Sequence, residues 1–193
     1  MSEAVGDSKG LSIVSESPDS GPIQFEEAYL RYRSRAFYAA CALVGDREEA
    51  MELVHEAFLR AYRAWDRFDQ DRRFYPWLHK ILRNLCLNRL RSRRRNPAKE
   101  SLDNLEDQGV IAPSTDPGPL SVMDQKERGE RVWQAVMSLA PDDREMILLR
   151  EYHGLSYSAI AEAVGCPLGT VMSRLHAARK RLRSAIEKRG ISI

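Results

Sequence analysis

The sequence predicts an all-α protein in which two small helical domains are joined by a flexible acidic linker. Apolar residues recur at spacings of three and four through most of the chain, and no stretch alternates for long as a strand does. With 193 residues, of which 43% are hydrophobic, the chain is long enough for two small cores. We expect a disordered tail at 1–24, an N-terminal domain at 25–95, a linker at 96–125 and a C-terminal domain at 126–189.

Three helices are expected in the N-terminal domain. The first begins at Phe25 and ends at Gly45, because glycine readily adopts the left-handed conformation that closes a helix. The second lies within 46–65, where acidic residues near its start suit the positive end of the helix dipole. The third has Pro76 in its first turn. The buried stripe expected in the second helix consists of Ala50, Leu53, Val54, Ala57, Phe58 and Ala61.

Charge is distributed unevenly along the chain, although the formal net charge is only +2. Residues 72–95 carry nine positive charges and no negative ones, and residues 168–190 carry seven positive charges and one negative charge. The linker holds one positive and six negative charges, a net of −5, and its proline and glycine residues interrupt any helical period. The two basic segments are therefore the candidate contacts to nucleic acid.

The segment around Gly165 has the spacing of a helix-turn-helix. Ser156 is a suitable N-cap for one helix, the glycine supplies a left-handed turn, and Pro167 opens the next helix. Ala161 lies four residues before the glycine and Val171 six after it, so a small side chain stands where the two helices cross. The residues of the second helix that are expected to face inward are Leu168, Val171, Leu175, Ala178 and Leu182.

The outward side of this second helix is expected to bind duplex DNA. Side chains near the start of such a helix meet base edges in the major groove, and arginines further along reach phosphates. The alternative is a basic helix that is merely solvated, but such a helix would not require the alanine, glycine and valine at these offsets. The expected contacts to duplex DNA are Thr170, Met172, Ser173, Arg174, His176, Arg179, Lys180 and Arg183.

The first basic segment has a different character, because aromatic residues are interleaved with its cations. Such a mixture suits unpaired strands, whose bases stack on aromatic or arginine planes while cations follow the backbone. The alternative is a helix with core aromatics and a solvated basic end, and Trp77 in particular is expected in the core. The loop from Phe68 to Tyr75 is the better candidate for holding a flipped base. The expected contacts to the opened strand are Phe68, Arg72, Arg73, Lys80, Arg83, Asn84, Asn88 and Arg91.

Three segments together resemble a bacterial sigma factor of the minimal, two-domain extracytoplasmic-function group, over residues 25–187. They are AMELVHEAFLRAY, WLHKILRNLCLNRLRSRRR and LAPDDREMILLREYHGLSYSAIAEAVGCPLGTVMSRLHAARKRLR. By this resemblance, the first docks on the clamp coiled coil of core RNA polymerase, the second melts the minus-ten element of promoter DNA, and the third recognises the minus-thirty-five element. The resemblance also implies an anti-sigma factor as a partner. The polymerase-binding residues that it implies are Glu52, His55, Glu56, Leu59 and Arg63.

Three positions depart from the family's pattern. His55 stands where glutamine is usual, Asn88 where aspartate is usual, and Met172 where lysine or arginine is common. A methionine cannot make the bidentate contact to guanine that arginine makes. We therefore expect Ser173 and His176 to carry more of the base recognition, at an unusual upstream sequence.

The expected function is transcription initiation at specific promoters, without catalysis by this chain. A stand-alone helix-turn-helix regulator is the nearest alternative, and it would footprint its operator without polymerase. A nuclease would need a carboxylate cluster beside a basic groove, which the sequence does not offer. Cys41, Cys86 and Cys166 are too widely spaced for a zinc site, so no metal or cofactor is expected. Without a membrane-length apolar run or a secretory signal, we expect a cytoplasmic protein with no membrane insertion.

Overall fold

The computed structural model describes residues 23–95 and 122–191, with side chains described from residue 128 onward in the second segment. Within these segments the chain is helical and has no strand. The predicted tail and most of the predicted linker lie outside the described residues. The elements are α1 (Phe25–Val44), α2 (Arg47–Arg63), the 3-10 turn η1 (Trp65–Arg67), α3 (Phe74–Arg95), α4 (Val122–Met137), α5 (Pro141–Ile147), the π turn η3 (Leu148–Tyr152), α6 (Tyr157–Val164) and α7 (Leu168–Glu187).

The helix ends follow local signals in the sequence. Gly45 closes α1 with a φ of 80°, in the left-handed region that glycine tolerates. The Asp46 carboxylate accepts a hydrogen bond of 2.7 Å from the Glu49 N–H and so caps α2. The Ser156 hydroxyl accepts one of 3.2 Å from the Ala159 N–H and caps α6, as expected. α4 starts at Val122, inside the segment predicted as linker.

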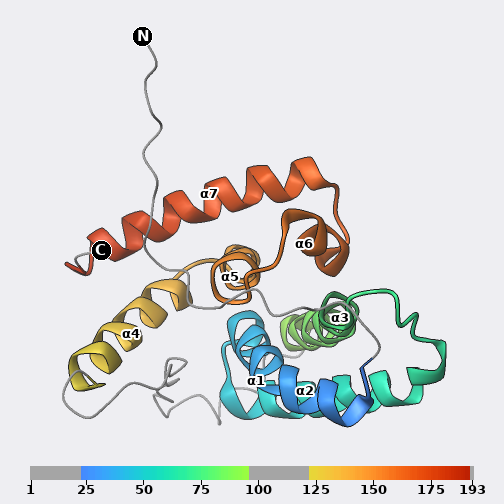
Figure 1. Ribbon diagram of the computed structural model, residues 1–193. Helices are drawn as coiled ribbons and strands as arrows, with labels where there is room; N and C mark the ends of the chain where they lie inside the picture. Colours follow the sequence, from blue (N-terminus) through green and yellow to red (C-terminus); the bar gives the residue numbers. More distant parts are fainter. Residues whose placement is uncertain (1–22, 96–121, 192–193) are drawn as a thin grey trace.

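The N-terminal domain is a group of three helices, because α1, α2 and α3 each pack against the other two (Figure 1). Their shared core holds fully buried large side chains such as Tyr32, Leu43, Leu78 and Leu82. The buried residues of α2 are those predicted from the helical period. Burial of this stripe positions the opposite side of α2 toward solvent.

The C-terminal domain is built around α5, α6 and α7. Val171, Leu175 and Ala178 of α7 are buried, and Leu182 is half-buried. Leu168 was expected to face inward, but it is 50% exposed. The reason is its position as the first residue of α7, ahead of the point at which α7 packs against α6.

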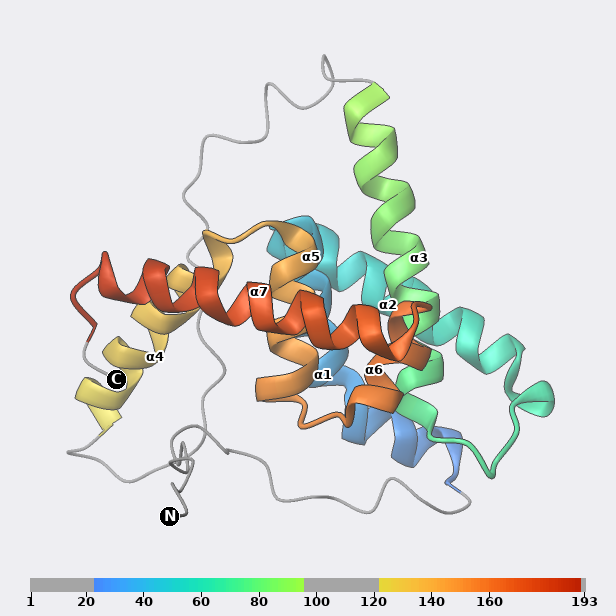
Figure 2. The same ribbon diagram turned by 90° about the horizontal axis from the view of Figure 1, so that it is seen from above.

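The two domains form one continuous structure. α1 packs against α5 and α3 against α6, so α7 and the three-helix group lie on opposite sides of α5 and α6 (Figures 1 and 2). The Tyr38 ring of α1 makes edge contacts with Trp133 and Tyr152, each with ring centroids 5.7 Å apart. One core cluster contains buried residues from both domains. The N-terminal basic helix α3 is therefore held beside the helix-turn-helix.

Candidate nucleic-acid interface

The turn between α6 and α7 has the geometry expected for a helix-turn-helix. Gly165 adopts φ 72° and ψ 42°, and its N–H donates to the Ala161 carbonyl at 2.9 Å. The Cys166 N–H donates to the same carbonyl at 3.1 Å. Val171 is fully buried one turn into α7. These contacts fix the start of α7 against α6, and the opposite side of α7 is exposed among the described residues apart from the ion pairs of two arginines.

This opposite side of α7 carries the predicted contacts to duplex DNA. Thr170 is half-buried, and its carbonyl accepts a hydrogen bond of 3.1 Å from the Ser173 hydroxyl. Met172 is 53% exposed. The other predicted contacts in this helix are all exposed: Ser173, Arg174, His176, Arg179, Lys180 and Arg183. The expectation that they face outward is confirmed, whereas contact with DNA stays a prediction.

Two of the arginines in α7 are bound to carboxylates of the same domain. Arg179 donates to Glu151 at 2.6 and 2.8 Å, and Arg181 donates to Asp143 at 2.8 and 2.9 Å. Partial burial lowers the pKa of Arg179, but the hydrogen bonds and charges of Glu151 and Tyr157 outweigh it and raise that pKa. Arg179 must therefore exchange a carboxylate for a phosphate if it is to contact DNA.

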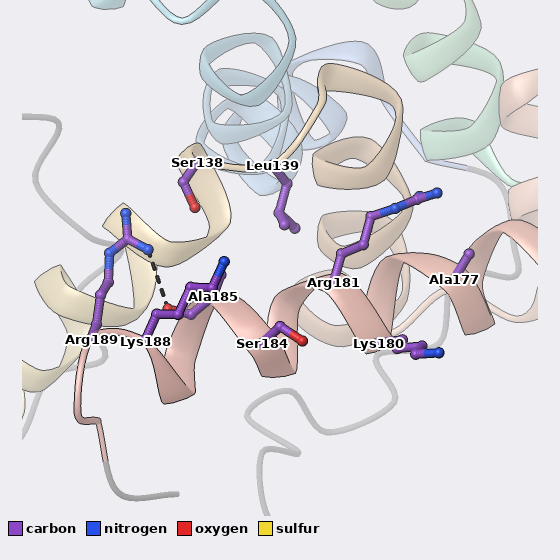
Figure 3. Close-up of a pocket in the computed structure, with 9 residues that line it drawn as sticks. All are labelled: Ser138, Leu139, Ala177, Lys180, Arg181, Ser184, Ala185, Lys188 and Arg189. Carbon is purple, nitrogen blue, oxygen red and sulfur yellow. Dashed lines mark hydrogen bonds between the residues drawn. The ribbon is translucent and has the colours of Figure 1, made fainter.

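A cationic groove continues along the second half of α7, against the turn between α4 and α5 (Figure 3). Arg189 lies at one end of it and donates a hydrogen bond of 3.2 Å to the Ala185 carbonyl. Sequence reasoning did not include this end of α7 among the contacts. The cations that line the groove are Lys180, Arg181, Lys188 and Arg189.

The predicted contacts in α3 divide into an exposed row and one half-buried residue, Arg83. Spacings of four, four and three place Lys80, Asn84, Asn88 and Arg91 on one face, and all four are exposed. The Arg91 guanidinium donates to the Asn88 side-chain oxygen at 3.2 Å. This row faces solvent, as expected for a surface that receives a nucleic-acid strand. Arg83 differs from the row because it is drawn into the domain interface.

The loop before α3 is anchored by an aromatic cluster. Phe68 is 8% exposed, with Trp65 stacked at 5.5 Å and Trp77 at 4.6 Å between ring centroids. Its ring is thus covered, and in this arrangement it anchors the loop instead of offering the predicted stacking surface. Trp77 is half-buried in the same cluster, in line with its expected place in the core. Arg72 and Arg73 of the loop are exposed, and so are the acidic residues Asp69 and Asp71.

Arg83 binds a carboxylate of the other domain. Its Nε donates to the two carboxylate oxygens of Glu145 in α5 at 2.9 and 3.0 Å. The Nε2 atom of His79 lies 2.9 Å from one of these oxygens, and since a carboxylate only accepts, Nε2 carries the proton. Burial raises the pKa of Glu145, but the hydrogen bonds and charges of His79 and Arg83 outweigh it and hold that pKa below its ordinary value. No spacing in the sequence pointed to this cluster.

The outward side of α2 carries both charged and apolar groups. Of the predicted polymerase contacts, Glu52, His55, Leu59 and Arg63 are exposed and Glu56 is half-buried. A hydrogen bond of 2.6 Å from Arg60 lowers the pKa of Glu56. Met51 and Tyr62 on the same helix are 58% and 61% exposed, beside Leu59 at 39%. The apolar part of this surface is therefore larger than the single leucine that the sequence suggested.

The described residues contain neither a cluster of metal-ligating side chains nor a helix fit to span a membrane. No three His, Cys, Asp or Glu side chains gather there as they would around a metal ion. None of the described helices combines the length and the apolar character that crossing a bilayer requires.

Comparison with known proteins identifies the class. Sigma-70 region 2 matches residues 28–96, and Sigma-70 region 4 matches residues 129–182. The chain is 35% identical to the RNA polymerase sigma-H factor of Pseudomonas aeruginosa over 167 residues, which is 84% of this chain and 86% of that protein. It is 38% identical to the ECF RNA polymerase sigma-E factor of Escherichia coli over 141 residues, 70% of this chain and 73% of that one.

Solved structures show the same fold. The sigma factor RpoE from Bartonella quintana, in complex with the anti-sigma factor NepR, aligns with a TM-score of 0.67 at 27% identity and covers 84% of this chain and 96% of its own. CnrH, in complex with the cytosolic domain of CnrY, aligns with a TM-score of 0.59 at 22% identity over 85% and 88% of the two chains. The fold and the two matched regions define a sigma factor.

The chain belongs to the ECF RNA polymerase sigma factors. It is accordingly a promoter-specific transcription initiation factor, and proteins of this class direct polymerase without being enzymes themselves.

Proposed function

We propose that α2 docks on core RNA polymerase while α7 binds the upstream promoter element as duplex DNA and α3 holds the opened downstream element. The observation that carries this division is the exposure of a single polar face on α7, directly after the turn at Gly165. The separate exposed row on α3 supports a second binding surface for a different part of the same promoter. One domain alone would bind DNA, but an initiation site has to be both located and opened.

In the upstream grip, base recognition falls to the first turns of α7. Ser173 and His176 present hydroxyl and imidazole groups that can hydrogen-bond base edges in the major groove. Arg174 and Arg183 supply charge to phosphates, which orient the helix without reading the sequence. Met172 contributes apolar contact, for example with a thymine methyl group, in place of a guanine contact.

In the downstream grip, the exposed row of α3 receives a strand whose bases have left the duplex. Unstacking a base costs a few kcal/mol, and stacking or arginine contacts return about 1–3 kcal/mol per base. Arg72 and Arg73 on the loop, with Lys80 and Arg91 on α3, follow the backbone, while the amides of Asn84 and Asn88 meet base edges. Phe68 supports the loop from beneath.

Docking uses the mixed surface of α2. Leu59 provides an apolar anchor, and the charged residues around it form the polar rim that usually surrounds the apolar centre of a protein interface. Glu52, His55, Glu56 and Arg63 then set its orientation through charge.

Partners follow from this role. The polymerase performs the chemistry, so we assign no reaction, metal or cofactor to this chain, and we place it in the cytoplasm beside the template. RpoE was solved with the anti-sigma factor NepR, which supports a protein of the anti-sigma kind as a regulator of this chain as well.

Transcription by core polymerase on a genomic template, with and without the protein, tests the proposal. New RNA start sites that depend on the protein support it. A stand-alone regulator would instead protect a specific DNA site in the absence of polymerase.

A further inference from the structure

The contact between Glu145 and α3 has a property that promoter recognition alone does not require: it joins the two domains. We propose that Glu145 is a latch that holds the free protein closed by binding Arg83 and His79, and that promoter recognition requires this latch to open. The statement that promoter recognition requires opening rests on the proposed function. The statement that Glu145 holds the free protein closed does not, because it concerns the free protein alone.

The latch is buried and specific. The Glu145 side chain is 1% exposed and that of His79 is not exposed at all, while the Arg83 side chain is 17% exposed. The Arg83 Nε–H is shared between both carboxylate oxygens, and such a charge-assisted hydrogen bond is stronger than one between neutral groups. All three side chains lie between α3 and α5, which are more than sixty residues apart in the chain.

Further contacts surround the latch on both sides. The Tyr75 hydroxyl of α3 lies 2.9 Å from Nδ1 of His153, in the C-terminal domain. The Arg144 guanidinium donates a hydrogen bond of 3.1 Å to the Ala42 carbonyl at the end of α1. On the loop, Arg72 lies 3.8 Å from Glu162 of α6. The interface is therefore formed by paired polar groups as well as by apolar contacts.

The charged composition suits an interface that opens. An interface made only of apolar groups would expose a large apolar surface, prone to aggregation, whenever the domains separated. Charged side chains are well solvated once they are released, and their burial in the closed form is offset by their mutual attraction and hydrogen bonds. Removal of one partner leaves the others buried without compensation, so the closed form depends strongly on each of them.

The closed form is too compact to engage both promoter elements. The minus-thirty-five and minus-ten elements are named for positions about 25 base pairs apart, roughly 85 Å of B-DNA. A compact body of the described size, 73 residues at 23–95 and 70 at 122–191, has a radius of gyration of about 14 Å and so spans roughly 40 Å. In the closed form α3 packs directly against α6, one helix away from the recognition side of α7. The domains must separate before both grips are used together.

Opening also releases a proposed DNA contact. The Arg83 guanidinium is occupied by Glu145 in the closed form, whereas Lys80, Asn84, Asn88 and Arg91 are already exposed. Closure therefore leaves part of the downstream surface accessible but prevents simultaneous use of the two domains. A partner that binds the open or the closed form shifts this equilibrium by its difference in affinity for the two.

Energy transfer between two dyes measures the latch directly. The free protein is labelled at Asp66→Cys in the N-terminal domain and Met172→Cys in α7, both on exposed positions, with Cys166→Ser to remove the partly exposed thiol. Cys41 and Cys86 are buried and stay unlabelled. Glu145→Gln removes the latch charge. Asp143→Asn is the matched control. It also removes a carboxylate charge from α5, but the Asp143 carboxylate binds Arg181 of the same domain and does not join the two domains.

The parent and Asp143→Asn are expected to give a single population with high transfer. In Glu145→Gln the ratio of open to closed molecules is expected to rise at least tenfold, with unchanged helical circular dichroism. Arg83→Met removes the same pair from the other domain and should give the same shift, which covers the case in which Glu145→Gln fails to fold. The latch would be overturned if the energy transfer in Glu145→Gln and Arg83→Met equalled that of the parent. It would also be overturned if the parent itself gave the low transfer of an open form. Neither result involves polymerase or promoter DNA, so the proposed function would stand.

Discussion

Tyr75 in α3 and His153, which follows the π turn η3, join the two domains through a buried contact of 2.9 Å between the hydroxyl oxygen and Nδ1. His153 is 3% exposed, and its Nε2 has no hydrogen-bond partner among the described residues. Burial, followed by the charges of His79 and Arg35, holds the pKa of His153 well below its ordinary value. The ring is therefore neutral in the closed form, a condition that links closure to pH.

Acidification should open the protein. In the open form His153 is solvated and protonates near its ordinary pKa of about 6.5, whereas in the closed form it stays neutral. The open form therefore binds more protons, and the closed form loses stability as the pH falls below about 6.5. The groups that face His153 are Tyr75 and His79 from α3, Arg35 from α1 and the neighbouring Tyr152.

The energy-transfer measurement between pH 8 and pH 5 checks this expectation. The closed fraction should be constant above pH 7 and fall below it. His153→Phe, which keeps an aromatic ring but cannot be protonated, should flatten the profile between pH 7 and pH 5. A profile that remains steep in this variant would assign the pH dependence to another group.

Base recognition and phosphate contact in α7 should separate in binding experiments. Arg174→Ala is expected to weaken the binding of the polymerase complex to all promoters alike and to reduce the dependence of log affinity on log salt by about one unit. His176→Ala and Ser173→Ala are expected to change which upstream sequences are preferred, at about 1–3 kcal/mol per base pair. Selection from a randomised upstream element measures both effects. An unchanged preference in His176→Ala would remove that residue from base recognition.

The docking surface can be tested by a charge placed on α2. Leu59→Arg is expected to abolish association with core polymerase, because the new charge would be buried without a partner at the centre of the interface. Leu168→Arg is the matched control: Leu168 is 50% exposed at the start of α7, in the other domain and away from α2. Co-elution on gel filtration reports association. Loss of binding in both variants, or in neither, would contradict the assignment.

The left-handed conformation of Gly165, in the turn of the helix-turn-helix, should make this position sensitive to substitution by alanine. Gly165→Ala is expected to cost about 1 kcal/mol in the free energy of unfolding, because φ is 72° although a Cβ there meets no atom within 4 Å. Gly169→Ala, in the first turn of α7, also meets no atom within 4 Å but has no unusual φ, and should stabilise by up to about 1 kcal/mol. Urea unfolding of both variants compares them, and equal effects would contradict this explanation.

Local features were largely predictable from the sequence, because they depend on neighbours in the chain. The caps at Ser156 and Gly45, the buried stripe of α2 and the outward row of α7 all follow from helical period and capping. Leu168 was placed wrongly because the period alone does not tell where the packing between two helices begins.

Features that depend on how the domains meet could not be predicted in this way. Glu145 looks like one more acidic residue in a charged helix, and only the packing of α5 beside α3 brings it to Arg83 and His79. Within the N-terminal domain, Phe68 was expected as a stacking surface, but Trp65 and Trp77 cover its ring, because helical period does not show how the loop folds back on its neighbours. The contacts between the domains are more distant in the sequence. Contacts between residues more than sixty positions apart leave no periodic signal.

Mapping of RNA 5′ ends tests the central claim, that α7 and α3 together direct initiation, most directly. Core polymerase is incubated with a genomic template and the protein, and the start sites are compared with those from polymerase alone and from polymerase with Leu59→Arg. We predict new start sites, each preceded by shared upstream and downstream elements, that appear with the parent protein and vanish with Leu59→Arg. Start sites identical to those of polymerase alone would contradict the account.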